Sequence, residues 1–337
     1  MKNIIFTRQY SIFISTGFLI ASIIYSLHSG AADIGLKEII PILLKGSGTP
    51  EFSILFDIRI PRIILGFAVG GSLSLAGTIL QGMFRNPLVE PYTLGISGGA
   101  ALGVALCITF GLHRIFPDFA MPFFGFTGAF AVALPVSLIN IRKGTLKTEG
   151  FLLMGVMISF ITSSMVTLIL AISRTEDLQG IIFWIMGSLE EPSWLLICIM
   201  LIVSLLCLVL SYMFSLDLNA LCLGEEEAAH LGINVERAKK TLFLIASVLT
   251  GVSVSIAGII GFAGLVVPHF VRMFTGYDHR LLFVVVFITG AGFLIFCDTI
   301  ARTIISPVEL PVGVITGIIG GSIFVYALGK RYLAKSG

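Results

Sequence analysis

The segment GFAVGGSLSLAG, Gly66 to Gly77, decides the fold class because it is apolar and yet holds four glycines in twelve residues. In a soluble helix a glycine costs roughly 1 kcal/mol relative to alanine. In a membrane, glycine lets two helix backbones approach each other closely. The whole chain shares this character, with 37 glycines among 337 residues. The segment is therefore typical of a tightly packed transmembrane helix.

The composition extends this interpretation to the rest of the chain. Hydrophobic residues make up 56% of the sequence and charged residues only 12%, whereas a soluble domain carries about 25% charged residues. Apolar runs of about 20 residues recur, which is the length that crosses a bilayer as a helix. They are continuous rather than alternating, so helices are favoured over the strands of a membrane barrel. The sequence predicts an all-α polytopic membrane protein.

About ten transmembrane helices are expected. The first is interpreted as an uncleaved span rather than a signal peptide, because its apolar run is long. An even number of spans places both termini on one side. With cytoplasmic termini, 14 of the 21 Lys and Arg residues fall inside, as the positive-inside rule favours. We expect one transmembrane domain over 1–337, with spans near 8–28, 62–84, 93–112, 121–140, 150–172, 193–214, 240–259, 262–276, 281–301 and 311–329.

The segment GEEEAAHLGINVERAKK, 224–240, lies in the longest internal cytoplasmic connection, 215–240, between spans six and seven. Its residues indicate two short helices. The glutamates from Glu225 onward suit the positive end of a helix dipole, Gly232 is a left-handed helix stop, and Asn234 can cap a second helix. We therefore expect a rigid cytoplasmic knob, with a solvated loop as the alternative.

No motif of enzyme chemistry was found. The sequence has no P-loop, HExxH or GxSxG, so no catalytic residue and no metal site is assigned. The five cysteines form no close pair and are interpreted as packing residues. His269, beside Pro268, is interpreted as structural rather than as a metal or haem ligand. Asp298 lies one turn before Arg302, which favours a local ion pair over a proton relay. The energy for any transport would have to come from a partner.

Three arginines fall at the predicted outer membrane face. Arg59 and Arg62 precede the second span in RIPR, and Arg302 follows the ninth. Arginine binds carboxylates well, so these side chains are candidates for contact with a partner. The alternative is interfacial snorkelling, or pairing with Asp57 and Asp298.

Two further groups are candidates for lining a pathway. FRNPLVEPYTLG, 84–95, leaves helical geometry near the membrane, so Asn86 and Leu88 could face a pathway rather than form an ordinary turn. Ser159, Ser163 and Thr167 are spaced by four in the fifth span and give one helix face rich in hydroxyls. Such hydroxyls often bond their own backbone or a neighbouring helix, which is the alternative.

Several long motifs together resemble one family. In sequence order they are RIPR, QGMFRNPLVEPYTLGISGGAALG, FWIMGSL, LGEEEAAHLGI, GFAGLVVPHFVR and ARTIISPVELPVG. They are similar to the permease subunit of type II ABC importers, the FecCD-type family that serves iron-siderophores, haem and vitamin B12. The resemblance runs from about residue 55 to residue 330.

The resemblance implies the type II ABC importer permease fold in a bacterial inner membrane, with the pathway at the interface of a homodimer. Two separate ATPase subunits would bind below and a periplasmic binding protein above. This chain would hold no cofactor, since ATP–Mg would bind the ATPase, and no nucleic-acid partner is implied. Arg59, Arg62 and Arg302 would meet glutamates of the binding protein, and Asn86 and Leu88 would lie near the cytoplasmic gate. The segment that contacts the ATPase would hold Gly224, Glu225, Glu226, Ala228, Ala229, His230, Leu231 and Gly232.

The substrate is not encoded in any motif of the chain. Metal chelates dominate the family, so we expect a metal chelate such as an iron-siderophore, haem or cobalamin. A branch of the family carries oxyanions such as molybdate or tungstate, which is the alternative. A stand-alone secondary transporter or channel is the alternative from another class.

Overall fold

The structure is a computed structural model that describes residues 2–30, 34–46, 48–117, 119–141, 148–191 and 193–333. Across these ranges the chain is helical and contains no strand. Each of the ten expected spans falls on one helix. These helices are α1 (Lys2–His28), α4 (Ile60–Met83), α5 (Ile96–Thr109), α6 (Ala120–Ile141), α7 (Thr148–Ile172), α9 (Trp194–Met213), α12 (Val235–Ala257), α13 (Ala263–Thr275), α14 (His279–Thr303) and α15 (Val312–Leu333).

Not all of these helices are long enough to cross a membrane alone. Six are long and apolar enough among the described residues, namely those within α1, α4, α7, α9, α12 and α14. Helix α13 has 13 residues and extends only about 20 Å, whereas the hydrocarbon core is about 30 Å thick. The expected segment at 262–276 thus coincides with α13, but this helix is shorter than the hydrocarbon core. Gly258 and Phe262 have positive φ values and interrupt the helical backbone before α13 begins.

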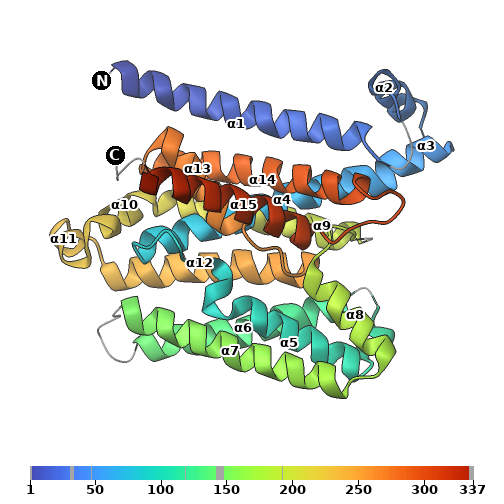
Figure 1. The fold of residues 1–337 in the computed structure, drawn as a ribbon. Helices are drawn as coiled ribbons and strands as arrows, with labels where there is room; N and C mark the ends of the chain where they lie inside the picture. The colour runs from blue at the N-terminus through green and yellow to red at the C-terminus, as the bar shows by residue number, and fades with distance from the viewer. Residues whose placement is uncertain are drawn as a thin grey trace.

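Short helices connect the long ones. They are α2 (Leu36–Lys45), α3 (Pro50–Ser53), the π-helix η1 (Ile54–Arg59), the 3₁₀ helices η2 (Pro91–Leu94) and η3 (Leu112–Arg114), α8 (Thr175–Met186), α10 (Ser215–Leu223) and α11 (Glu225–His230). Helices α2 and α3 lie at one end of the bundle, and α11 projects from the other (Figure 1).

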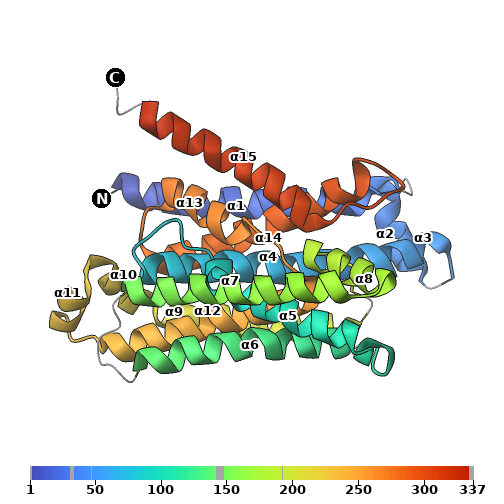
Figure 2. The ribbon, with the colours of Figure 1, turned by 60° about the horizontal axis from the view of Figure 1, so that its bottom comes forward.

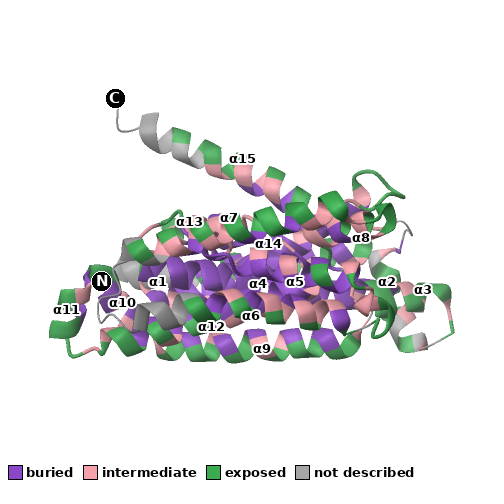
Figure 3. Ribbon diagram, turned by 90° about the horizontal axis from the view of Figure 1, so that it is seen from below, coloured by how far each residue is buried: buried purple, intermediate pink, exposed green. Residues whose placement is uncertain are grey.

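Helix α4 forms the centre of the bundle, and nearly all of its residues are buried (Figure 3). It packs against α14, α12, α9 and α13. Gly70 lies against the backbone of Gly290 in α14, and Gly77 lies against Gly264 in α13, so a Cβ at either glycine would overlap its neighbour. The glycines of the opening segment therefore allow backbone contact between helices, as predicted.

The start of α1 and the end of α15 lie at the same end of the bundle as α11 (Figures 1 and 2). Four of the basic residues that favour a cytoplasmic assignment of this end, Arg142, Lys143, Lys147 and Lys335, lie outside the described residues. Helix α15 begins beside α8 and then diverges from the bundle toward its C-terminal end (Figure 2).

Candidate functional site

The projecting knob is built from α10, Gly224, α11 and the start of α12. Gly224 breaks the helix between α10 and α11 with a φ of 145°. Helix α11 ends in a Schellman motif: Gly232 N donates to Ala229 O at 2.9 Å, and Ile233 N donates to Ala228 O at 3.1 Å. Gly232 has a φ of 84°, as its predicted role requires. The knob is thus defined by hydrogen bonds at its turns.

The sequence predicted that the second helix of this segment would be short, but the structure shows a long one. Asn234 caps it, accepting a hydrogen bond from Arg237 N at 3.0 Å, but the helix that begins there is α12 itself. The expected separate helix and the span at 240–259 are one continuous helix because no Gly or Pro interrupts 235–250. The knob is therefore an extension of a membrane helix.

One ion pair and one buried methyl group fix α11 against α12. Lys239 Nζ lies 2.6 Å from Glu225 Oε1, and Lys239 is only 5% exposed. Ala228 is fully buried in the main core cluster together with Ala238 of α12. The opposite side of α11 is open to solvent: Glu226, Ala229, His230 and Gly232 are exposed, and Leu231 is 65% exposed.

The three outer arginines are buried within the chain. Arg59 is 2% exposed, and its guanidinium donates to the carbonyls of Leu27 and of His28, the latter at 3.1 Å. The expected freedom of this side chain at the membrane face is thus not seen. Its neighbour Asp57 forms none of the ion pairs of the described residues.

Arg62 and Arg302 each hold carboxylates. Arg62 Nη2 lies 2.7 Å from Glu309 Oε2 and 3.4 Å from Glu190 Oε2, and those two carboxylate side chains are 48% and 72% exposed. Arg302 Nε donates to Asp298 Oδ2 at 3.0 Å, which is the local ion pair expected from their spacing. Arg62 therefore pairs with acidic side chains that reach the surface, whereas Arg302 pairs with a buried aspartate.

The loop between α4 and α5 folds back into the bundle. Asn86 Oδ1 accepts a hydrogen bond from Leu88 N at 2.9 Å, which forms a tight turn, and Leu88 is 57% exposed. Beyond this turn, Tyr92 Oη donates to Ile260 O at 2.6 Å and accepts from Ile260 N at 3.0 Å. The loop thereby fixes the break between α12 and α13.

Glu90 of the same loop also binds the segment between α12 and α13. Its Oε1 accepts a hydrogen bond from Phe262 N at 2.8 Å. Burial raises the pKa of the Glu90 carboxyl above its usual value, and the hydrogen bond from Phe262 opposes the rise. Phe262 itself has a φ of 68°, an uncommon value for a residue with a side chain. Neither Glu90 nor Tyr92 was singled out in the sequence, although both lie within the motif quoted for Asn86.

The hydroxyl-rich face of α7 does not enclose a conduit within one chain. Ser159 Oγ donates to Gly155 O at 3.0 Å, and Thr167 Oγ1 donates to Ser163 O at 2.9 Å, so both hydroxyls bond their own helix. Ser163 and Thr167 are exposed on the outside of the chain. A role in a pathway formed with a second chain stays a prediction.

A cavity of about 830 Å³ opens at the knob end of the bundle. It lies between the end of α4, the second half of α13 and Tyr326 of α15, and Asn86 contributes to its wall. Arg272 reaches its wall from α13 and donates to Gln81 Oε1 of α4. This cavity combines an apolar wall with several polar side chains.

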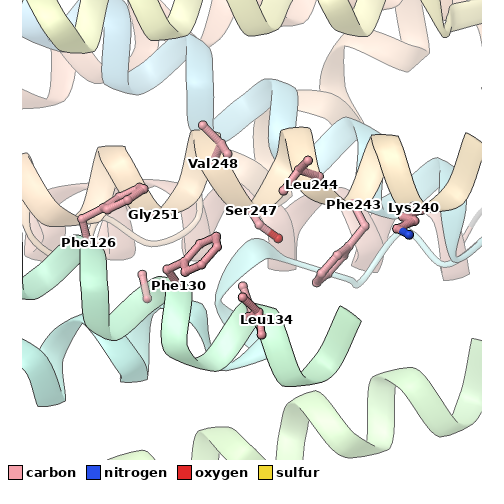
Figure 4. Close-up of a pocket in the computed structure, with 11 residues that line it drawn as sticks. Phe126, Phe130, Leu134, Lys240, Phe243, Leu244, Ser247, Val248 and Gly251 are labelled. Carbon is pink, nitrogen blue, oxygen red and sulfur yellow. The ribbon is translucent and has the colours of Figure 1, made fainter. Parts of the chain in front are cut away.

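A smaller cleft of about 230 Å³ lies between α6 and α12 and is almost entirely apolar (Figure 4). Phe130 and Leu134 of α6 face Phe243 and Leu244 of α12 across it. The Ser247 hydroxyl points into it and has no hydrogen-bond partner among the described residues. Within those residues no group of three His, Cys, Asp or Glu side chains could hold a metal ion.

The family model of the FecCD transport family matches residues 18–330 of the chain. The chain belongs to the FecCD transport family. It is therefore a multi-pass membrane protein and a permease of the binding-protein-dependent ABC importer class, in which the permease is not the catalytic subunit.

Relatives and a solved structure agree with this membership. The chain is 36% identical to the hemin transport system permease protein HmuU of Yersinia pestis, over 95% of this chain and 97% of the relative. It is 33% identical to the molybdate import system permease protein MolB of Haemophilus influenzae, over 92% of each. A solved structure, assigned to a metal-chelate type ABC transporter in an inward-facing conformation, superposes with a TM-score of 0.83 at 30% identity and covers 96% of this chain and 99% of that one.

Proposed function

We propose that this FecCD permease forms a homodimer in a bacterial inner membrane and imports a metal chelate by alternating access. Two separate ATPase subunits that bind ATP–Mg would drive it, and a periplasmic binding protein would deliver the substrate. The observation that supports the ATPase contact is the knob. Its exposed side, formed by Ala229, His230, Leu231 and Gly232, is carried by a six-residue helix whose other side is fixed to α12.

A rigid connection is what such a contact needs. Force applied to α11 passes through the Lys239–Glu225 pair and the buried Ala228 directly into a helix of 23 residues. A floppy loop would absorb the same displacement. The knob is thus suited to convert movement of a partner into movement of α12.

Contact with the binding protein would involve an exchange of carboxylates. Arg62 is held by Glu190 and Glu309, whose side chains reach the surface at the end of the bundle opposite α11. A glutamate of the partner would replace one of these exposed carboxylates on the same guanidinium. Arg302, which is paired with the buried Asp298, and Arg59, which binds carbonyls, would support this site from below.

The relatives support the proposed substrate class. The relation to a hemin permease and the close superposition on a metal-chelate type transporter support a chelate. A molybdate oxyanion is the second candidate, supported by the comparable identity to a molybdate permease. Asn86, Leu88 and the hydroxyls of Ser159, Ser163 and Thr167 are proposed to face the pathway of the assembled dimer.

Reconstitution tests the proposal. The permease is inserted into vesicles with its ATPase subunit and its binding protein, and uptake of radiolabelled iron chelates, hemin, cobalamin and molybdate is measured with and without ATP. We expect ATP-dependent uptake of one chelate. Uptake of molybdate alone would select the second candidate. Uptake that needs no ATPase and follows an ion gradient would instead identify a secondary transporter.

A further inference from the structure

The cavity at the knob end of the bundle has an unusual charge balance. Thirteen residues line it, and they include two arginines, Arg85 and Arg272, but no aspartate or glutamate. Arg272 is hydrogen-bonded to the neutral side chain of Gln81. Isolated positive charges attract anions strongly where the surrounding walls exclude part of the solvent. The remaining lining side chains are Asn86, Cys222, His269, Tyr277, His279 and Tyr326 together with Gly82, Pro87, Phe270 and Met273.

Arg85 occupies a backbone position that favours glycine. It has a φ of 49° and ends α4 in a Schellman motif, in which Arg85 N donates to Gly82 O at 3.2 Å and Asn86 N donates to Gln81 O at 3.1 Å. The same motif at the end of α11 uses Gly232. A side chain in left-handed geometry is strained, and such strain gathers at functional positions.

His279 adds a buried polar atom to the wall. It is 2% exposed, its Nδ1 lies 2.7 Å from Asn219 Oδ1, and its Nε2 has no hydrogen-bond partner within the described part of the chain. Because Asn219 Oδ1 also accepts from His279 N at 3.0 Å, Nδ1 is the protonated nitrogen. Nε2 is then an acceptor, suited to a hydroxyl group of a ligand.

We propose that this cavity binds an oxyanion of the phosphate type, with Arg85 and Arg272 as its cationic partners. A hydroxyl of the ligand would donate to His279 Nε2, either the P–OH of hydrogen phosphate or a hydroxyl of the lipid headgroup. The ligand is either a free tetrahedral oxyanion or the phosphate of an anionic lipid, because both present negatively charged non-bridging oxygens to the arginines. The half-buried Phe270 and Met273, which is 67% exposed, would accommodate an apolar body attached to that group. The site does not depend on which substrate is transported.

Cys222 supplies a reporter within the cavity. Cys222 is an exposed residue whose Sγ lies 3.5 Å from Gly82 O. Partial burial raises the pKa of its thiol, and the charges of Arg272 and Arg85 oppose this rise. In the full-length Cys198→Ser protein in phosphatidylcholine nanodiscs, the rates of modification by an anionic and a cationic methanethiosulfonate are compared. We expect the ratio of anionic to cationic rates to exceed that of a matched reporter, Leu223→Cys in a Cys222→Ser background, since Leu223 is exposed but does not line the cavity.

Substitution of each arginine tests whether it attracts anions into the cavity. Arg85→Gly and Arg272→Gln should each lower the rate ratio about fivefold, because one charge about 8 Å away in water changes the two rates by about 2.4-fold each, in opposite directions. Arg85→Gly relieves the left-handed strain, so its unfolding temperature should not fall and misfolding cannot explain the loss. Arg280→Gln removes a charge at the same end but outside the cavity and should leave the ratio unchanged.

Addition of phosphate or of an anionic lipid distinguishes the two possible ligands, a free oxyanion and a lipid phosphate. Saturable slowing of Cys222 modification by inorganic phosphate, beyond that of sodium chloride at equal ionic strength, assigns a free oxyanion. Slowing only when phosphatidylglycerol is included in the nanodisc assigns a lipid phosphate. If neither slows the reaction, or if both arginine variants keep the wild-type ratio, the arginines serve only the C-terminal ends of α4 and α13 and the proposal is overturned.

Discussion

Lys239 Nζ lies 2.6 Å from Glu225 Oε1, and this ion pair joins the first turn of α11 to the second turn of α12. The amino group is almost fully buried, whereas the carboxylate is partly exposed. Removal of one member of this pair should therefore cost more than at an ordinary surface pair.

Lys239→Met should loosen the knob. The apolar stem is kept, but the ion pair with Glu225 is lost, so we expect a loss of about 1–3 kcal/mol in local stability. Limited proteolysis and hydrogen exchange across 224–234 should show the change. Arg237→Met is the matched control because Arg237 is exposed on the same helix, and it should stay within about 0.5 kcal/mol. Equal protection in the two variants would contradict the role of the pair.

Ala229→Pro should separate ATP hydrolysis from transport. Proline removes a backbone donor and clashes with the preceding turn, at a cost of about 3 kcal/mol or more within a helix, and α11 has only six residues. The membrane helices should remain folded, as judged by size-exclusion profile and helix content. The measured ratio of substrate imported to ATP hydrolysed should fall at least tenfold. Ala229→Ser keeps the backbone donor and should transport normally; coupled uptake by the proline variant would refute the knob as a coupling element.

Arg302→Met should be strongly destabilising because it leaves Asp298, which is 4% exposed, without its partner. Loss of one member of a buried pair costs about 3–5 kcal/mol. The double variant Asp298→Leu, Arg302→Met should recover most of this loss, as measured by thermal unfolding in detergent.

A surface pair provides the comparison. Arg114 lies 3.7 Å from Asp177 and is 64% exposed, so Arg114→Met should cost less than about 1 kcal/mol. If the double variant at 298 and 302 is as unstable as the single arginine variant, the ion pair is not the source of the loss.

The substitutions Arg85→Gly and Gly232→Ala should change the free energy of unfolding in opposite directions. Relief of left-handed strain is worth about 1–2 kcal/mol, and the added freedom of glycine in the unfolded chain removes about 0.4–1 kcal/mol of this. Arg85→Gly should thus stabilise by about 0.5–1 kcal/mol. Gly232→Ala should destabilise by a similar amount through the backbone alone, since no atom lies within 4 Å of its added Cβ. Unfolding temperatures of the two variants measure this directly, and a shift of the same sign in both would contradict the argument.

Features set by neighbouring residues could be predicted from the sequence. The stop at Gly232, the cap at Asn234 and the Asp298–Arg302 pair each depend on residues within five positions of one another. Glycine within apolar runs similarly indicated close helix packing before any contact was known.

Features that join distant segments could not be predicted in this way. Arg62 and Glu309 are 247 positions apart, and Tyr92 and Ile260 are 168 apart. No periodicity or turn signal encodes such a meeting, because it depends on how the helices pack. For the same reason the burial of Arg59 against the end of α1 was missed, and the cavity wall shared by α4 and α13 had no local signal.

The glycine contacts of α4 bear on which helices of this permease can move relative to one another. Where Gly70 meets the backbone of Gly290 and Gly77 meets that of Gly264, the helices are in backbone contact, and even a methyl group at either glycine would overlap its neighbour. We therefore expect helices α4, α13 and α14 to move as one rigid unit during transport. Helix α15, which diverges from the bundle toward its C-terminal end, is the element that we expect to move relative to this unit (Figure 2).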